Sequence, residues 1–202
     1  MRGTLVNRAK FGYSGNAKPL HGRPPRRIQY DENLTRLAMA QEETVSIYTG
    51  GSCTENPGGA GGYGVVMLEE GRNIELSRGY RKTTNNRMEM LAVIEGLRAL
   101  KTRCRVFVQS DSQYVVDSVN QGLVKVWKAK GWRRAKGRKV LNPDMWEKLL
   151  RQIKRHEVEL AWVPGHSGIP GNERADVLAV KAARGKRLAV DRGYEAQLMR
   201  SG

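Results

Sequence analysis

The segment from residue 44 to residue 64 constrains the fold of this chain more than any other. Val45, Ile47 and Thr49 alternate with more polar neighbours, which is the period-two pattern of a half-buried β-strand. The strand runs into a loop that carries five glycines between positions 58 and 64. Glycines in such a place indicate a bulge or the close approach of a ligand. We therefore expect the first strand to end at a loop that admits close contacts.

Four later segments predict further strands, at residues 63–68, 74–80, 105–109 and 158–163. The first three strands follow one another through short links, so they most simply form an antiparallel meander. Helices are expected to begin near Asn86, Gln113 and Asn172, where a residue that favours helix caps precedes apolar residues at helical spacing. The order of elements predicts an α/β domain.

Three acidic residues could each have either a structural or a functional role. Glu89 falls at the third position of the helix that Asn86 is expected to cap, so it could simply close a capping box. Asp111 follows a strand, and ligands gather at the carboxyl ends of strands in α/β sheets. It could also be nothing more than the cap of the next helix. Asp176 lies one turn inside the last helix, and a single helical Asp is usually a solvated charge.

The net charge of +16, from 36 Lys and Arg against 20 Asp and Glu, is the strongest signal in the composition. A surface of this sign gains sequence-independent affinity for phosphate backbones, so nucleic acid is the expected partner. We find no basic amphipathic helix or lipidation signal for a membrane surface. No apolar run approaches the roughly 18 residues that cross a bilayer, so no membrane role is expected.

The segment from Leu123 to Val140 holds most of the clustered positive charge and contains no acid. Its cations are interleaved with Trp127 and Trp132, and this mixture suits a nucleic-acid backbone better than a solvated helix face. The basic residues of this segment, which we call the basic protrusion, are Lys125, Lys128, Lys130, Arg133, Arg134, Lys136, Arg138 and Lys139.

The length suits one domain with tails, and three parts are expected. Residues 1–43 form a basic and largely irregular extension, read as a nucleic-acid arm, an organelle transit peptide or an inert extension. Residues 44–184 form the domain, and residues 185–202 form a C-terminal tail. Cys53 and Cys104 are too few for a disulfide framework, so a reducing compartment, the cytoplasm, and a monomer are expected.

Several motifs, in order and with matching spacing over about residues 44 to 184, resemble those of type 1 ribonuclease H of the bacterial kind. They are Tyr48-Thr49-Gly50-Gly51-Ser52-Cys53, Asn56-Pro57-Gly58, Gly61-Gly62-Tyr63-Gly64, Thr83-Thr84-Asn85-Asn86-Arg87-Met88-Glu89, Ser110-Asp111-Ser112-Gln113-Tyr114, Trp127 with Gly131-Trp132, Trp162-Val163-Pro164-Gly165-His166-Ser167-Gly168 and Asn172-Glu173-Arg174-Ala175-Asp176. The resemblance implies a mixed five-stranded sheet, with three antiparallel and then two parallel strands, and helices on both faces.

The resemblance also implies an activity, namely endonucleolytic hydrolysis of the RNA strand of RNA/DNA hybrids with two Mg²⁺ ions, for which Mn²⁺ can substitute. Glu89, Asp111 and Asp176 match three of the family's four metal ligands, and His166 matches a histidine that assists proton transfer or product release. Hard oxygen ligands suit such ions. The implied hybrid-binding residues are Asn56, Asn85, Asn86, Gln113, Trp127, Lys128, Lys130, Trp132, Arg133 and Arg134.

Gly50 departs from the family pattern, which has an aspartate that bridges both metal ions at this place. Glycine offers no ligand, so we expect severely reduced activity, and Glu55 in the adjacent loop is an alternative ligand without fixed geometry. An introduced substitution, a natural hybrid-binding pseudoenzyme and a sequence error would each explain Gly50. The remaining functional alternatives are a catalytically inactive hybrid-binding protein and, more weakly, a binder of double-stranded RNA or ribosomes.

Overall fold

The computed structural model describes residues 44–69 and 71–201. The predictions for residues 1–43, including the irregular basic extension, lie outside the described residues. Within the described ranges, no helix is both long and apolar enough to cross a membrane.

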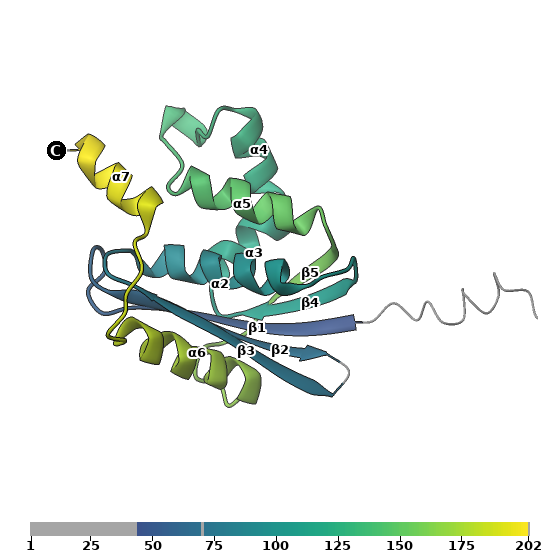
Figure 1. Ribbon diagram of the computed structural model, residues 1–202. Coiled ribbons are helices and arrows are strands. Elements are labelled where there is room, and N and C mark those ends of the chain that lie inside the picture. The colour runs from purple at the N-terminus through teal and green to yellow at the C-terminus, as the bar shows by residue number, and fades with distance from the viewer. Residues whose placement is uncertain (1–43, 70, 202) are drawn as a thin grey trace, which may run out of the picture. The chain divides into compact units, whose positions relative to one another are not determined.

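Five strands form one sheet in the order β3-β2-β1-β4-β5 (Figure 1). Their bounds are Thr44–Cys53 for β1, Gly61–Glu69 for β2, Arg72–Tyr80 for β3, Arg105–Ser110 for β4 and Glu157–Trp162 for β5. β1, β2 and β3 pair antiparallel, whereas β4 runs parallel to both β1 and β5. The predicted mixed sheet is confirmed, and the strands at 63–68, 74–80, 105–109 and 158–163 lie where the alternation placed them.

Helices cover both faces of the sheet (Figure 1). One face carries α2, Asn85–Ala99, with α3, Gln113–Asn120, α4, Leu123–Ala129, and α5, Pro143–Ile153, beside it. The other face carries α6, Pro170–Ala183, which packs across β1, β2 and β3. A short 3₁₀ helix, η1, spans Ala135–Gly137, and α7, Arg192–Ser201, ends the described chain.

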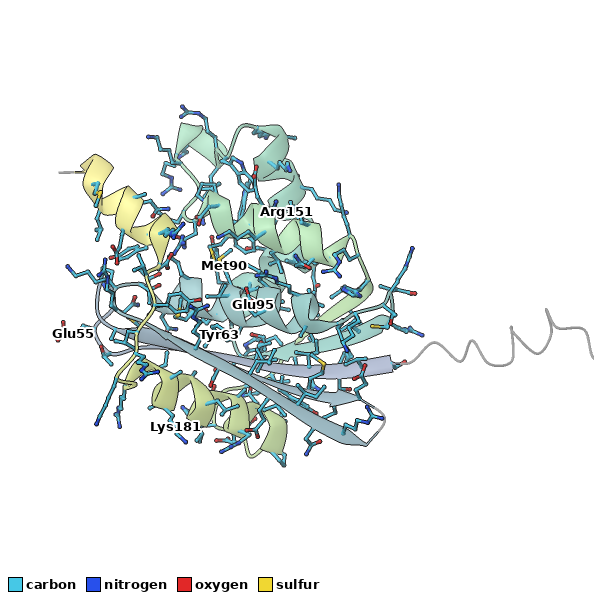
Figure 2. All side chains as sticks on the ribbon, in the orientation of Figure 1. Glu55, Tyr63, Met90, Glu95, Arg151 and Lys181 are labelled. Carbon is cyan, nitrogen blue, oxygen red and sulfur yellow. The ribbon has the colours of Figure 1, made fainter. Side chains whose placement is uncertain are left out.

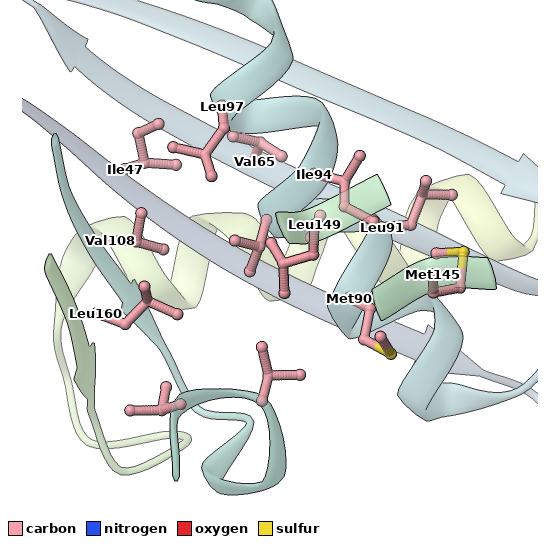
Figure 3. Packing of buried hydrophobic residues seen from close by; sticks show 14 of the residues in the cluster. Ile47, Val65, Met90, Leu91, Ile94, Leu97, Val108, Met145, Leu149 and Leu160 are labelled. Atoms are coloured by element: carbon pink, nitrogen blue, oxygen red, sulfur yellow. The ribbon is translucent and has the colours of Figure 1, made fainter. Parts of the chain in front are cut away.

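The alternation along β1 sends successive side chains to the two faces of the sheet. Val45 and Ile47 are buried in the main core, between the sheet and α2, with Val65, Leu97 and Val108 (Figure 3). Tyr48 instead packs with a second cluster under α6. Trp146 of α5 is fully buried in the main core, which therefore extends from the sheet through α2 to α5.

Two predicted helix caps are wrong. Helix α2 begins at Asn85 and is capped by Thr84, whose hydroxyl oxygen accepts a hydrogen bond of 3.3 Å from the backbone N–H of Arg87. Asn86 is therefore inside the helix, and it forms no capping box with Glu89. Helix α6 begins at Pro170 rather than after Asn172, because proline needs no N–H partner at the first helical position.

Arg87 ties the C-terminal segment to the body of the domain. Its side chain is fully buried and donates to both carboxylate oxygens of Asp191, at 2.7 Å each, and to both of Asp144, at 2.9 Å each. Asp191 also accepts from the hydroxyl of Thr83 at 2.7 Å. Burial alone would raise the pKa of Asp191, but the hydrogen bonds from Arg87 and Thr83 lower it below its ordinary value. The tail after residue 184 is thus anchored at the start of α2.

We predict that Asp191→Asn lowers the free energy of unfolding by about 3 kcal/mol at pH 7, because a buried Arg loses one of its two charged partners. The pKa of Asp191 is lowered in the folded state, so its contribution is complete above pH 5 and fades as the pH falls below about 4. Denaturant titrations at pH 7 and pH 3 measure both effects.

Glu195→Gln is the matched control, because it also changes an acid to its amide in the C-terminal segment. Glu195 pairs with the exposed Arg81, and a surface ion pair of this kind contributes little to stability. Equal stability of the Asp191→Asn variant and the unaltered chain at pH 7 would contradict the proposed anchor.

Candidate active site

Gly50 is buried near the carboxyl end of β1, directly under helix α6. In the sheet, Gly50 pairs with Gly64 of β2. The preceding residue, Thr49, pairs with Ser110 of β4. A Cβ atom at position 50 would overlap Oδ1 of Asp176 and would lie 3.1 Å from the backbone nitrogen of Asp176. The carboxylate of Asp176 therefore occupies the space that a side chain at position 50 would need.

Asp176 is held close to the sheet in an environment that opposes its charge. Burial, followed by the negative charge of Asp111, raises its pKa to about 6, and the charge of His166 acts in the opposite direction. Its Oδ2 atom is buried and has no hydrogen-bond partner among the described residues. A solvated surface charge is therefore the wrong description of this residue.

Glu89 points from α2 toward the end of β4. Its carboxylate accepts a hydrogen bond of 2.5 Å from the amide nitrogen of Asn85 and a short one from the hydroxyl of Ser112. Burial raises its pKa, the Ser112 hydrogen bond opposes that shift, and the charge of Asp111 adds to it. The backbone of Glu89 lies against Gly51, where a Cβ would come within 2.9 Å of the Glu89 Cα.

Asp111 follows β4 at the edge where the parallel strands end. Its backbone carbonyl accepts from the indole N–H of Trp162 at 3.1 Å, which joins the ends of β4 and β5. Ser112 rather than Asp111 occupies the cap position of α3, and its side chain makes no cap hydrogen bond. Burial raises the pKa of the Asp111 carboxyl, and the charge of His166 opposes that shift. The Asp111 side chain is therefore free of the capping role and faces the site.

His166 stands on the loop between β5 and α6, with 85% of its side chain exposed. Its backbone is left-handed, at φ 53°, which few residues other than glycine adopt. Nδ1 lies 3.8 Å from Oε2 of Glu173, whose other oxygen accepts from the backbone N–H of Gly168 at 3.1 Å. Glu173 thus holds the loop that presents His166 beside Asp111 and Asp176.

Of the three predicted carboxylates, only that of Asp176 lies against Gly50, whereas Glu89 lies against Gly51. Asp176 is influenced by Asp111 and Glu89, and Glu89 by Asp111. The donor set and the unpartnered Oδ2 of Asp176 fit a hard divalent cation. In this arrangement, no three His, Cys, Asp or Glu side chains of the described chain lie close enough together to hold one ion.

Of the four polar side chains that the sequence marked for hybrid binding, Asn85 contacts one of these carboxylates, that of Glu89. The Asn56 side-chain oxygen accepts from the backbone N–H of Asn85 at 3.1 Å, and this bond joins the glycine-rich loop to the start of α2. Asn86 follows in the same turn, half-buried, and Gln113 is exposed at the start of α3. They lie in segments that adjoin Glu89 and Asp111.

The basic protrusion is built from α4 and η1, and its two tryptophans are placed differently. Trp127 is only 8% exposed and packs edge-on against Trp146, with 5.9 Å between ring centres. Arg134 covers it at 5.0 Å and donates to the hydroxyl of Tyr114 at 2.8 Å. Trp132 is half-buried, and Lys128, Lys130 and Arg133 are exposed. The observed contacts of Trp127 and Arg134 are structural, and their part in nucleic-acid binding stays a prediction.

Ser112 and Glu173 contribute to the site without having been singled out in the sequence. Ser112 fixes the Glu89 carboxylate, and Glu173 supports the His166 loop. A helix-start Ser after a strand-end Asp is a signal that could have indicated Ser112. Glu173 gives no such signal, because its role depends on the path of a loop.

A five-stranded mixed sheet in this strand order, covered by helices on both faces, defines a protein of the RNase H fold. A family model for RNase H matches residues 42–184, and the chain belongs to the RNase H family. The chain is 53% identical over 147 residues to a Ribonuclease H of Desulforamulus reducens, covering 73% of this chain and 92% of the relative. It is 52% identical over 157 residues to a Ribonuclease H of Syntrophus aciditrophicus, covering 78% and 90%.

Solved structures agree with this assignment. The crystal structure of LC9-RNase H1, described as a type 1 RNase H with the type 2 active-site motif, superposes with a TM-score of 0.64 at 34% identity, covering 77% of this chain and 81% of that one. LC11-RNase H1, solved in complex with an RNA/DNA hybrid, gives a TM-score of 0.51 at 25% identity, covering 69% and 96%. The resemblance inferred from the motifs is confirmed at the level of the family.

We predict that Gly51→Ala destabilises the protein by about 1–3 kcal/mol, because the added methyl group would push against the backbone of α2 at Glu89. The same shift should weaken the Ser112–Glu89 hydrogen bond. Denaturant titration measures the stability. Ser52→Ala is the control at the next position of β1, and a Gly51→Ala variant as stable as this control would contradict the close approach.

Proposed function

We propose that this chain binds RNA/DNA hybrids and hydrolyses their RNA strand, with an activity that is severely impaired because position 50 lacks a carboxylate. Membership of the RNase H family supports the reaction class. The observation that carries the impairment is the location of Gly50 under Asp176, among three acids whose pKa values are all raised. Residue 50 contributes no ligand beside Asp176.

Glu89, Asp111 and Asp176 would hold the divalent cations, Mg²⁺ or Mn²⁺, that carboxylate oxygens prefer. Two such ions, when bound, supply an activated water and a stabilised leaving oxygen for phosphodiester hydrolysis. The chain's own part is to fix these carboxylates. Ser112 and Asn85 hold Glu89, while the contact between α6 and β1 holds Asp176. Without a carboxylate at position 50, fewer negative charges offset the charge of two neighbouring cations.

His166 is proposed to move protons or assist product release at the rim of the site. Its ring is exposed, so it can exchange protons with water, and its charge already acts on Asp111 and Asp176. Glu173 lies within ion-pair distance of its Nδ1 atom, at 3.8 Å. This arrangement supports a proton-transfer role that does not depend on Gly50.

The hybrid would be recognised by polar side chains and by charge. Asn56, Asn85, Asn86 and Gln113 can hydrogen-bond to 2′-hydroxyls in the shallow minor groove, which distinguishes RNA from DNA. Lys128, Lys130 and Arg133 are exposed and can neutralise phosphates, together with the half-buried Trp132. We propose a monomer in the cytoplasm, in keeping with a sequence whose two cysteines, Cys53 and Cys104, are too few for a disulfide framework.

A catalytically inactive hybrid-binding protein is the second candidate. The observation that favours it is that Asp176 fills the space above Gly50, so the structure is well packed without a carboxylate there. Glu55 offers little compensation, because it is exposed and stands at the outer end of the glycine-rich loop (Figure 2). The two candidates share the hybrid-binding surface and differ only in catalysis.

The decisive change is Gly50→Asp. We expect hydrolysis of a labelled RNA/DNA hybrid in Mg²⁺ or Mn²⁺ to rise about a hundredfold or more, since a metal-binding carboxylate is worth several kcal/mol in the transition state. The side chain of Asp176 must rotate to admit the new group.

Gly50→Asn is the matched control, because it has the same size and adds no charge. It should remain near the activity of the unaltered chain. An aspartate variant that is no faster than the asparagine variant would overturn the assignment of the metal site. An unaltered chain as fast as the aspartate variant would overturn the account of Gly50.

For the basic protrusion, we predict that replacing Lys128, Lys130 and Arg133 together by Ala weakens hybrid binding and lowers the slope of log K against log salt by about 2 to 3. Arg134 is left in place because it packs on Trp127. The control replaces Lys101, Arg103 and Lys154, which are exposed outside the protrusion and the candidate site. Equal slopes for the two triple variants would remove the protrusion from the interface.

A further inference from the structure

A groove of about 770 Å³ begins at the candidate active site and continues along the outer side of α6. Asp176 and His166 line its first part, Val177 and Val180 its middle, and Lys181, Arg184 and Lys186 its far end. Positions 176, 177, 180, 181 and 184 recur at helical spacing, so they share one face of α6. Figure 2 shows Lys181 on this helix, pointing away from the sheet. The groove therefore links the carboxylates to a separate basic surface.

The two ends of the groove carry opposite charge. Asp176 and Glu173 lie at the first end, whereas no acid lines the far end beside Lys181, Arg184 and Lys186. All three cations are exposed. Glu75 does not neutralise this end, because Arg174 donates to both Glu75 oxygens at 2.7 and 2.8 Å. The pKa of Glu75 is lowered first by that hydrogen bond and only then by the charge of Lys181. The far end thus offers positive charge to a ligand.

Two valines separate the ends, on a side of the helix that faces solvent. Val177 is 54% exposed and Val180 is 38% exposed, while Ala175, Leu178 and Ala179 form the buried side of α6. An apolar surface between an anion-binding end and a metal-binding end matches a nucleic-acid strand, whose sugars are less polar than its phosphates. The groove that offers this surface is continuous with the candidate active site.

We propose that this α6 groove binds the RNA strand of the hybrid beyond the phosphate that is cut. The proposal rests on the proposed function, because the strand held at Asp176 is then the strand that is hydrolysed. A rise of 1.5 Å per residue puts Arg184 about 12 Å from Asp176 along α6. A strand that advances about 3.4 Å per nucleotide covers this distance in three to four nucleotides. Lys181, Arg184 and Lys186 contact the phosphates at that point.

The test replaces Lys181, Arg184 and Lys186 together by Ala in the full chain. Binding of a fluorescent RNA/DNA hybrid, followed by anisotropy over a range of salt, should weaken about tenfold near 0.1 M salt, and the salt slope should fall by about 2. The Lys101, Arg103 and Lys154 triple variant has the same loss of charge and should keep the slope of the unaltered chain. Thermal melting confirms that both variants are folded.

Strand identity is tested with hybrids whose RNA strand is shortened by four nucleotides at either end, opposite an unchanged DNA strand. One truncation should weaken binding of the unaltered chain but not of the Lys181, Arg184 and Lys186 variant, because only the former has the contact to lose. The matching truncation of the DNA strand should affect both proteins equally. An effect confined to DNA truncation would overturn the assignment to the RNA strand.

Failure of the groove and failure of the proposed function give different results. An unaltered chain that binds hybrid no better than duplex DNA would overturn both proposals. An unaltered chain that prefers hybrid, with a groove variant of equal affinity and equal salt slope, would overturn the α6 groove alone.

Discussion

The close contact between α6 and the sheet determines where Asp176 lies relative to β1. Glycines at positions 62, 64 and 79 have no Cβ atoms, and a Cβ at any of them would overlap backbone atoms of α6. At Gly62, for example, it would come within 2.6 Å of the nitrogen of Ala183. The helix backbone can therefore rest on the strands, and Asp176 is carried over the end of β1. Without this approach, Asp176 would be an ordinary solvated charge.

The same contact gives the site its electrostatic character. The chain has a net charge of +16, yet Glu89, Asp111 and Asp176 gather at one edge of the sheet and raise one another's pKa values or have them raised by burial. Groups that lose stability by being charged gain most from a cation. In the proposed function, the positive surface would bind phosphate and the three acids would hold divalent ions. Gly50 is therefore proposed to impair catalysis without impairing hybrid binding.

The sequence predicted the features that depend on local pattern. The patterns of apolar residues located all five strands. The motifs indicated Glu89, Asp111 and Asp176, whose charges influence one another, and their role as metal ligands stays a prediction. Local competition explains the incorrect caps, since Thr84 and Pro170 each lie a little earlier in the chain than the predicted Asn residues and fix the helix start. A residue type that favours helix caps does not by itself fix where a helix begins, because the path of the backbone decides which residue stands at the cap position.

Other features could not be predicted because they depend on contacts between distant segments. Arg87 meets Asp191 across 104 positions of sequence, and no local pattern indicates that contact. The burial of Trp127 against Trp146 is of the same kind, and it makes part of an apparently exposed basic segment structural. The α6 groove also emerges only once α6 is placed beside the His166 loop.

The central proposal is that Gly50 leaves Glu89, Asp111 and Asp176 short of one further metal-binding carboxylate. Calorimetric titration of Mn²⁺ into the unaltered chain and into the Gly50→Asp variant tests it without relying on turnover. Loss of even a supporting residue typically costs 10–100-fold in metal affinity, so the variant should bind at least about tenfold more tightly. Equal affinity in the two proteins would contradict the claim.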